Sequence, residues 1–156
     1  MSDGEIVLVL GLGNRLMSDD AAGPLVIDRL AELARTDVVL RDGGTMGMSL
    51  LPEIEDADAI IAVDAARFGG APGTVRVFEG NDMDSQVGGL KKTAHEVALA
   101  DLMSAAAIQN MLPRRRALVA VEPEKVSLGL EPTQAVSAAI PQICAAVDAI
   151  LARWRG

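Results

Sequence analysis

Short apolar runs alternate along the chain with longer segments in which apolar residues recur at helical spacing. The runs are rich in β-branched residues and too short for helices, so they predict buried strands. They lie at residues 6–10, 38–40, 59–63, 74–78 and 117–121. Polar residues interrupt the fourth run, which is typical of a strand at the edge of a sheet.

The segments between the runs predict helices. These lie at residues 22–33, 49–54 and 94–111, and a last helix opens at 131–133. Ser18 and Asp19 are placed to cap the first helix. Thr93 and Glu96 have the spacing of a capping box before the third helix. Residues 81–89 are rich in Asp, Ser and Gly and predict a mobile loop.

The last helix carries an apolar stripe whose spacing follows one helical face. The members of the stripe are Ile140, Ile143, Val147, Ile150 and Trp154. Cys144 is the only cysteine of the chain and lies on the same stripe, which predicts a core residue and not a nucleophile. A single cysteine also excludes an intramolecular disulfide.

The alternation of helices with nearly continuous apolar strands predicts an α/β fold, a three-layer sandwich around a mostly parallel sheet. The 156 residues suit one compact domain over residues 1–156, with no repeat or linker. Hydrophobic residues make up 50% of the chain and aromatic residues only 2%. The core must therefore be built from aliphatic side chains and Met.

The net charge of −8 argues against binding to nucleic acid or to an anionic membrane. The only basic run, residues 114–116, follows a proline and precedes an apolar stretch, so we expect a solvated loop there. The N-terminus is acidic where a signal peptide is basic, and no apolar run approaches the length of a membrane span. A soluble cytoplasmic protein is the expectation.

Acidic residues collect where the predicted strands end. Asp19 and Asp20 follow the first strand, Asp42 ends the second and Asp64 ends the third. The only histidine, His95, lies in the first turn of a predicted helix. In an open α/β sheet, ligands bind at the carboxyl ends of the strands. Each residue alone also has a structural explanation, such as a helix cap, a turn or a local bond to the backbone.

The grouping of these residues favours a metal site. Several carboxylates on one rim repel one another unless a cation or a proton lies between them. Two carboxylates and one imidazole suit a divalent transition metal, and three ligands leave positions for water or substrate. The N-terminus of a helix disfavours the imidazolium form of His95, which keeps a lone pair available for a metal.

Two glycine-rich segments follow strands. Residues 11–14 begin like a dinucleotide-binding loop, but Leu16 stands where the third glycine would be. Asp19 and Asp20 also place negative charge where a pyrophosphate would bind, so nucleotide binding is not expected. Residues 43–47 form either a plain turn or a loop whose backbone approaches an extended peptide.

Together, these motifs resemble the hydrogenase maturation endopeptidases from about residue 6 to residue 140. The order and spacing of the motifs carry the resemblance, and no motif is decisive alone. In chain order they are residues 8–14, Asp19 and Asp20 with Gly23, Asp42 to Thr45 with Gly47, Asp64, His95 with residues 99–101, residues 123–124, residues 129–130 and residues 132–133.

The resemblance implies a three-layer α/β/α sandwich with a five-stranded, mostly parallel, twisted sheet. It also implies an endopeptidase that removes the C-terminal extension of a nickel-iron hydrogenase large-subunit precursor after nickel insertion. The alternative is a nickel-site assembly chaperone that binds the precursor without cutting it.

The resemblance further assigns roles to residues. Asp20, Asp64 and His95 match the metal ligands of the family, and with Asp42 they are the candidate catalytic residues. The candidate substrate-binding residues are Asp42, Gly43, Gly44, Thr45 and Gly47. Nickel is expected to arrive with the precursor, and zinc or cadmium to replace it in isolated protein. The metal either activates the scissile bond or a water, or only anchors the substrate while a carboxylate handles the proton.

Overall fold

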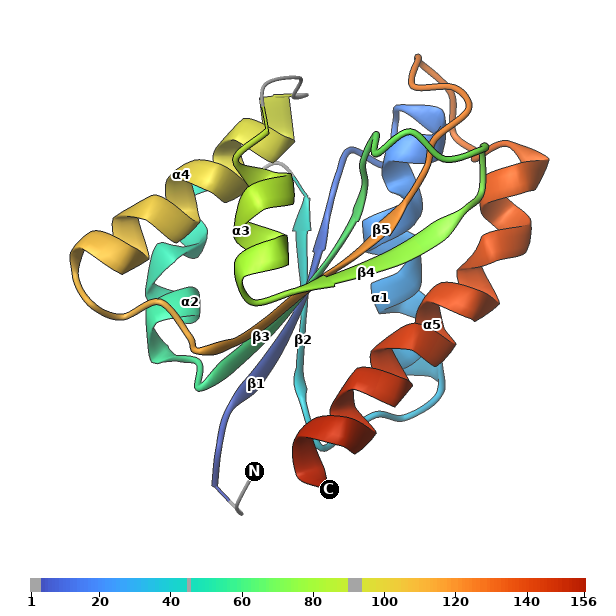
Figure 1. Ribbon diagram of the computed structural model, residues 1–156. Helices are drawn as coiled ribbons and strands as arrows, with labels where there is room; N and C mark the ends of the chain where they lie inside the picture. The colour runs from blue at the N-terminus through green and yellow to red at the C-terminus, as the bar shows by residue number, and fades with distance from the viewer. Residues whose placement is uncertain (1–3, 45, 90–93) are drawn as a thin grey trace.

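The computed structural model describes residues 4–44, 46–89 and 94–156, apart from the side chains of residues 94–98. Within this part of the chain, five strands form one sheet in the order β2-β1-β3-β5-β4 (Figure 1). The strands are β1 (Val7–Leu12), β2 (Val39–Gly44), β3 (Ala59–Ala65), β4 (Val75–Glu79) and β5 (Arg115–Val121). Only β4, at one edge, is antiparallel to its neighbour, so the predicted mostly parallel sheet and its edge strand are confirmed.

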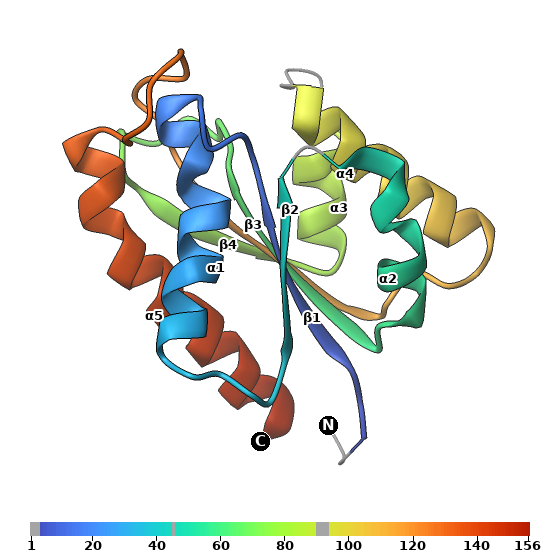
Figure 2. The same cartoon turned by 180° about the vertical axis from the view of Figure 1, so that it is seen from behind.

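Helices cover both faces of the sheet, as the two opposite views show (Figures 1 and 2). On one face lie α1 (Ala22–Glu32) and α5 (Gln134–Arg155). On the other face lie α2 (Leu51–Asp56), α3 (Asn81–Val87) and α4 (Ala94–Ile108). Two 3-10 helices, η1 (Ser18–Ala21) and η2 (Gly47–Leu50), precede α1 and α2. The predicted three-layer α/β/α sandwich is confirmed.

The central strands β1 and β3 are buried along their whole length because both of their faces are covered. Side chains alternate between the two faces of a strand. Val7 and Val9 of β1 therefore belong to the core under α1 and α5, whereas Leu8 and Leu10 belong to the core under α2, α3 and α4. This double burial explains why the strands read as continuous apolar runs in the sequence.

The segment at residues 81–89 was predicted to be a mobile loop, and this prediction is wrong because α3 occupies most of it. Met83 and Val87 are buried, and their spacing of four residues places them on one face of the helix. Two apolar residues in seven give too short a pattern to stand out from a polar loop.

The basic run was also predicted to be a loop, but Arg115 and Arg116 belong to β5. Arg116 donates two hydrogen bonds to the carboxylate of Asp84 in α3, at 2.8 and 2.6 Å. Arg116 therefore binds the neighbouring helix layer.

Helix α5 contradicts the expectation that no apolar segment has the length of a membrane span. It has 22 residues, and among the described residues it is the one helix whose length and composition would allow it to cross a membrane. Its buried residues face the sheet and are Val136, Ala139, Ile143, Cys144, Val147, Ile150 and Leu151. A long apolar helix that packs on a sheet in a protein core has the same length and composition. The predicted core stripe with Cys144 is confirmed.

Candidate active site

The carboxyl ends of β1, β2, β3 and β5 meet at one edge of the sheet, which we call the carboxyl rim and which lies uppermost in Figure 1. After β1 the chain passes over one face of the sheet to β2, and after β2 it passes over the other face to β3. The strand order therefore reverses beside β1. Open α/β sheets bind ligands at such a switch point.

Asp20 lies in η1, in the loop that leaves β1 at the switch point, and is only 7% exposed. Its Oδ2 accepts a hydrogen bond of 2.8 Å from the backbone N–H of Asn14. The loop closes this tightly because residue 13 is glycine, with φ of +130°. A Cβ atom at Gly13 would lie 1.9 Å from the carbonyl oxygen of Asp20, so no other residue fits there.

Asp64 lies near the end of β3 and is 1% exposed. The preceding residue, Val63, pairs with Gly11 of β1, and η1 packs against β3. Gly23 at the start of α1 permits this close approach, because a Cβ there would lie 2.6 Å from the carbonyl oxygen of Val63. Asp20 and Asp64 are thus brought to the same part of the carboxyl rim by elements that touch.

A small pocket opens beside Asp64 between the sheet and the helices α3 and α4. Its other lining residues are Ala66, Gln86, Val87, Leu99 and Leu118. The N-terminal end of α4 lies at the carboxyl rim (Figure 1). His95 belongs to the first turn of α4, but its side chain lies outside the described residues.

The predicted convergence of Asp20, Asp64 and His95 therefore stays a prediction. Among the side chains that the structure describes, no three His, Cys, Asp or Glu residues lie close enough to hold a metal ion. The two carboxylates of the predicted set lie in η1, which follows β1, and in the adjacent strand β3.

Asp42 was predicted to end the second strand, but β2 continues through Gly44, so Asp42 lies within the strand. Its Oδ1 accepts a hydrogen bond of 2.9 Å from the backbone N–H of Gly44. Its Oδ2 accepts two hydrogen bonds from the guanidinium of Arg15, at 2.7 and 3.1 Å. Arg15 also binds both carboxylate oxygens of Asp28 in α1, at 2.7 and 2.9 Å.

Arg15 therefore joins the loop after β1 to the glycine-rich segment after β2. The backbone N–H of Gly13 also donates to the carbonyl of Gly44, at 3.3 Å. Of the candidate substrate-binding residues, Gly44 and Gly47 have positive φ angles of +46° and +62°, and Thr45 lies outside the described residues. Sequence reasoning missed Arg15, because nothing local links it to residues so far along the chain.

Asp19 was predicted to cap α1, and this prediction is wrong. It is fully buried, and its carboxylate accepts hydrogen bonds from the backbone N–H groups of Glu124, Lys125 and Thr133 at 2.8, 2.9 and 2.6 Å. The hydroxyl of Thr133 donates a further bond of 2.9 Å. Ser18 was also expected to cap, but its Oγ donates to the carbonyl of Ser127 at 2.7 Å.

Burial alone would raise the pKa of the Asp19 carboxyl. The backbone N–H groups of Lys125, Thr133 and Glu124 outweigh this effect and hold the pKa below its usual value. Asp19 is therefore an ionised anchor that ties η1 to the loop between β5 and α5.

Glu122, which follows β5, is an acidic residue of the rim that sequence reasoning missed. It is 5% exposed, and its Oε1 accepts the backbone N–H groups of Phe68 and Gly70, both at 2.9 Å. It thus holds the loop after β3 in place. The rule that singled out Asp64, an acidic residue at the end of an apolar strand, would have found it.

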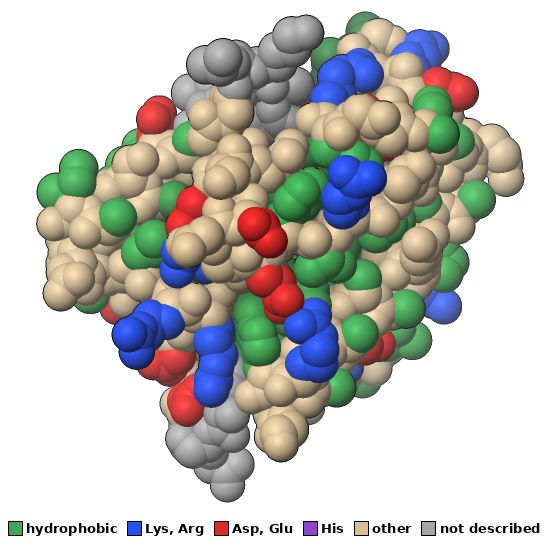
Figure 3. All heavy atoms as spheres, viewed as in Figure 1, with side chains coloured by type: hydrophobic (Ala, Val, Ile, Leu, Met, Phe, Trp, Pro, Cys, Tyr) green, Lys and Arg blue, Asp and Glu red, His purple; other side chains and the backbone are tan. Residues whose placement is uncertain are grey.

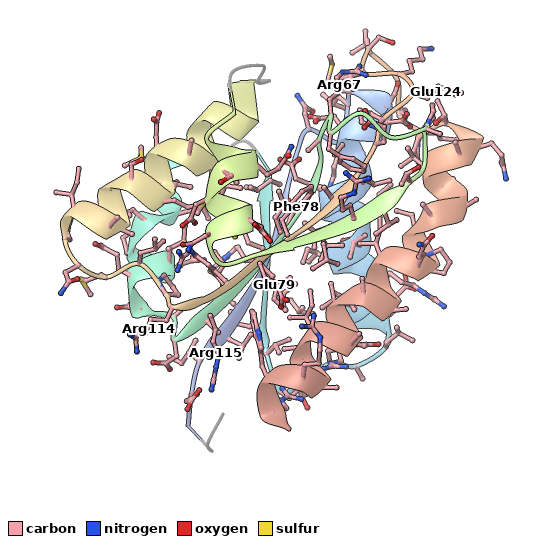
Figure 4. All side chains as sticks on the ribbon, in the orientation of Figure 1. Arg67, Phe78, Glu79, Arg114, Arg115 and Glu124 are labelled. Carbon is pink, nitrogen blue, oxygen red and sulfur yellow. The ribbon has the colours of Figure 1, made fainter. Side chains whose placement is uncertain are left out.

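Charged side chains lie at both ends of the sheet (Figure 4). Arg67 and Glu124 lie at the carboxyl rim, on the loops after β3 and β5. Arg114 and Arg115 lie at the opposite end, where Arg115 contacts Glu5 at 3.4 Å. The buried acidic residues of the described part of the chain, Asp19, Asp20, Asp64 and Glu122, lie at the carboxyl rim.

Comparison with known proteins agrees with this arrangement. Residues 24–150 match the family model described as hydrogenase maturation protease. The chain is 34% identical over 151 residues to the hydrogenase 2 maturation protease of Escherichia coli K12, with 90% of both sequences covered. It belongs to the hydrogenase maturation protease family.

Other members of the hydrogenase maturation protease family agree in sequence and in fold. The chain is 37% identical over 121 residues to the hydrogenase expression/formation protein HupD of Rhodobacter capsulatus, covering 76% of this chain. That match spans 58% of HupD, which is less than two thirds of its length. The hydrogenase maturating endopeptidase HybD of Escherichia coli superimposes with a TM-score of 0.88 at 31% identity, covering 95% of this chain and 93% of HybD.

Proposed function

We propose that this chain is an endopeptidase that removes the C-terminal extension of a nickel-iron hydrogenase large-subunit precursor once nickel has been inserted. The observation that carries the proposal is the pair of buried carboxylates, Asp20 and Asp64, at the switch point of a sheet in this family. The relatives named protease and endopeptidase support cutting over the assembly chaperone.

Nickel enters this proposal as part of the substrate. Asp20 and Asp64 offer oxygen ligands from η1 and β3. His95 would supply an imidazole, which suits nickel and zinc. In support, Leu99 stands one helical turn after His95 in α4 and lines the pocket beside Asp64.

The protein itself offers no thiolate to this site. Its only cysteine, Cys144, is buried against the other face of the sheet, and burial raises the pKa of its thiol. Two carboxylates and one imidazole form an incomplete shell, so the cysteines of the precursor would complete it. Binding then depends on the nickel that the precursor carries, which makes the metal a checkpoint for cleavage.

Asp42 has a positioning role in this scheme. Both of its carboxylate oxygens accept hydrogen bonds, from Gly44 and from Arg15, so it is bound within the protein. It fixes the segment 42–47, along which the extended tail of the precursor would lie. The proton transfer is then left to a water activated at the metal or to a carboxylate of the rim.

The test compares cleavage of nickel-loaded and nickel-free precursor by the same enzyme preparation. We expect cleavage of the loaded precursor alone, and no cleavage by Asp64→Asn. Equal cleavage of both precursors would refute the checkpoint. Binding of loaded precursor without cleavage by the unmodified chain would support the chaperone instead. Zinc-loaded precursor that binds without being cut would show that the identity of the metal matters beyond anchoring.

A further inference from the structure

The loop between β5 and α5, residues 122–133, exposes apolar side chains at the carboxyl rim, where it stands out in orange in Figure 1. Leu128 and Leu130 are 80% and 78% exposed. Leu16, in the loop after β1, is 52% exposed and lies beside them. The carbonyl of Leu16 accepts the N–H of Gly129 at 2.8 Å, which joins the two loops. We call Leu16, Leu128 and Leu130 the leucine ridge.

The backbone under the leucine ridge is firmly held. The N–H of Ser18 donates to the carbonyl of Gly129 at 2.9 Å, and Ser18 itself adopts a positive φ of +52°. A Cβ at Gly129 would lie 2.8 Å from the Oγ of Ser18. Below these contacts, the buried carboxylate of Asp19 binds both ends of the loop, at Glu124 and at Thr133.

This arrangement strains the backbone more than a loop that only faces solvent would need. A non-glycine residue, Ser18, is held in the left-handed region of backbone conformation. The result is that three leucines are exposed to solvent on a backbone that is already ordered. A partner that binds there does not have to order the loop, which favours affinity.

The leucine ridge is continuous with the candidate active site. The short helix η1 carries Asp19, which anchors the ridge, and next to it Asp20, which lies at the switch point. Leu16 stands two residues after Asn14, whose N–H binds the carboxylate of Asp20. A protein whose tail reaches Asp20 therefore passes beside the ridge.

We propose that the leucine ridge is a docking surface for an apolar patch on the folded protein substrate, next to the segment that is cut. The inference rests on the proposed function and adds the chemistry of the surface that the substrate must present. Exposed apolar residues gathered at one place mark sites of protein interaction, and interface cores are depleted of charge. The part of the partner surface that contacts the ridge is therefore apolar.

The experiment uses the double variant Leu128→Ser/Leu130→Ser in the full chain. Ile108→Ser is the matched control, because Ile108 is 86% exposed but ends α4, which runs away from the rim (Figure 1). Steady-state cleavage of nickel-loaded precursor gives kcat and KM, and thermal unfolding verifies that each variant is folded. We expect KM to rise about tenfold or more in the double variant, kcat to stay within about twofold, and the control to match the unmodified chain.

Binding is measured separately, with Asp64→Asn as the non-cutting background for both the ridge and control variants. There we expect the Kd for loaded precursor to rise about tenfold with the ridge variant only. Unchanged KM and Kd would overturn the docking surface while leaving the endopeptidase intact. If light scattering shows that the double variant loses self-association with KM unchanged, the ridge binds a second copy of this chain and the proposal is wrong. Absence of cleavage by the unmodified chain would refute the proposed function. The comparison of Kd values would still test whether the leucine ridge binds the precursor.

Discussion

At the scale of the residue, two adjacent aspartates have different tasks. Asp19 and Asp20 are both buried in η1. Successive side chains of a 3-10 helix point about 120° apart. Asp19 therefore reaches the loop between β5 and α5, whereas the carboxylate of Asp20 returns to Asn14 at the rim. The first is a structural anchor, and we propose the second as a ligand for the metal of the substrate.

Replacing Asp19 with Asn should destabilise the fold far more than replacing Asp20. An amide has one acceptor oxygen, so at least one backbone N–H of Glu124, Lys125 or Thr133 loses its partner. Loss of a buried hydrogen bond to a charged acceptor costs about 2–3 kcal/mol in the free energy of unfolding. Urea unfolding measures it, and Asp20→Asn serves as the control. An unchanged unfolding midpoint for Asp19→Asn would contradict the anchor.

The same anchor predicts a pH dependence of stability. Because the pKa of Asp19 is lowered in the folded state, its contribution is complete above the unfolded-state pKa of about 3.9 and is lost as pH falls through the lower folded-state pKa. The gap in unfolding free energy between the unmodified chain and Asp19→Asn should therefore be widest above about pH 5 and should narrow below about pH 4. A gap that is constant across a pH series would contradict this.

Arg15 gives a second prediction at this scale. Arg15→Ala removes the cation that joins Asp42 to Asp28, so the segment 42–47 loses a restraint. Its side chain is 42% exposed, and exposed ion pairs contribute about 0–1 kcal/mol, so stability should change little. The KM for precursor should rise several-fold, and Arg15→Lys should restore part of it. Arg29→Ala, which breaks the exposed pair with Glu32, is the control. Equal KM values for both alanine variants would show that Arg15 does not position the segment.

At the scale of the element, the start of α1 lies directly on the ends of β1 and β3. Gly11 and Gly23 leave no side chain between these backbones, since a Cβ at Gly11 would lie 2.5 Å from the carbonyl oxygen of Gly23. The close packing of α1 on these strands also places η1, which precedes α1, against the end of β3. The site thus depends on how closely one helix approaches two strands.

Gly23→Ala should therefore disturb both stability and cleavage. The added Cβ would lie 2.2 Å from the carbonyl oxygen of Leu12, and a backbone atom within a sheet cannot move aside. We expect a loss of about 2 kcal/mol or more, because α1 must lift from the sheet. Circular dichroism during urea unfolding measures the loss, and Glu32→Ala at the exposed end of α1 is the control. Unaltered stability would mean that the approach of α1 is adjustable.

At the scale of the whole molecule, the candidate site draws on elements far apart in the sequence: η1, β3 and the first turn of α4. The described residues on the face shown in Figure 3 do not suggest a competing site for a charged partner. On the face shown in Figure 3, acidic and basic side chains are interspersed, despite the net charge of −8. Several arginines among the described residues form ion pairs, such as Arg116 with Asp84.

His95→Ala tests whether α4 contributes to this site. Alanine is a good helix former, so α4 should persist and the unfolding transition should stay near that of the unmodified chain. Cleavage of nickel-loaded precursor should fall below detection, because the chain contains no other imidazole. Normal cleavage by the purified variant would exclude His95 from the chemistry and from metal binding.

The sequence by itself determined the order of the strands and of the helices other than α3, the double cover of the sheet and the core position of Cys144. Strands buried on both faces must be apolar at every position, and a helix on a sheet must be apolar along one stripe. Both patterns can therefore be recognised within a short stretch of sequence. It also placed Asp20 and Asp64 at strand ends, where a parallel sheet gathers them.

Only the tertiary structure decided which partner each polar side chain has. The bonds of Asp19 to Glu124, Lys125 and Thr133 span 105, 106 and 114 residues, and that of Ser18 to Ser127 spans 109. The same holds for Arg15 with Asp42 and for Glu122 with the loop after β3. Periodicity reports which face of an element is buried, because burial repeats along the chain. It does not predict a single contact between distant loops. Such contacts form the carboxyl rim and hold the loop that bears the leucine ridge.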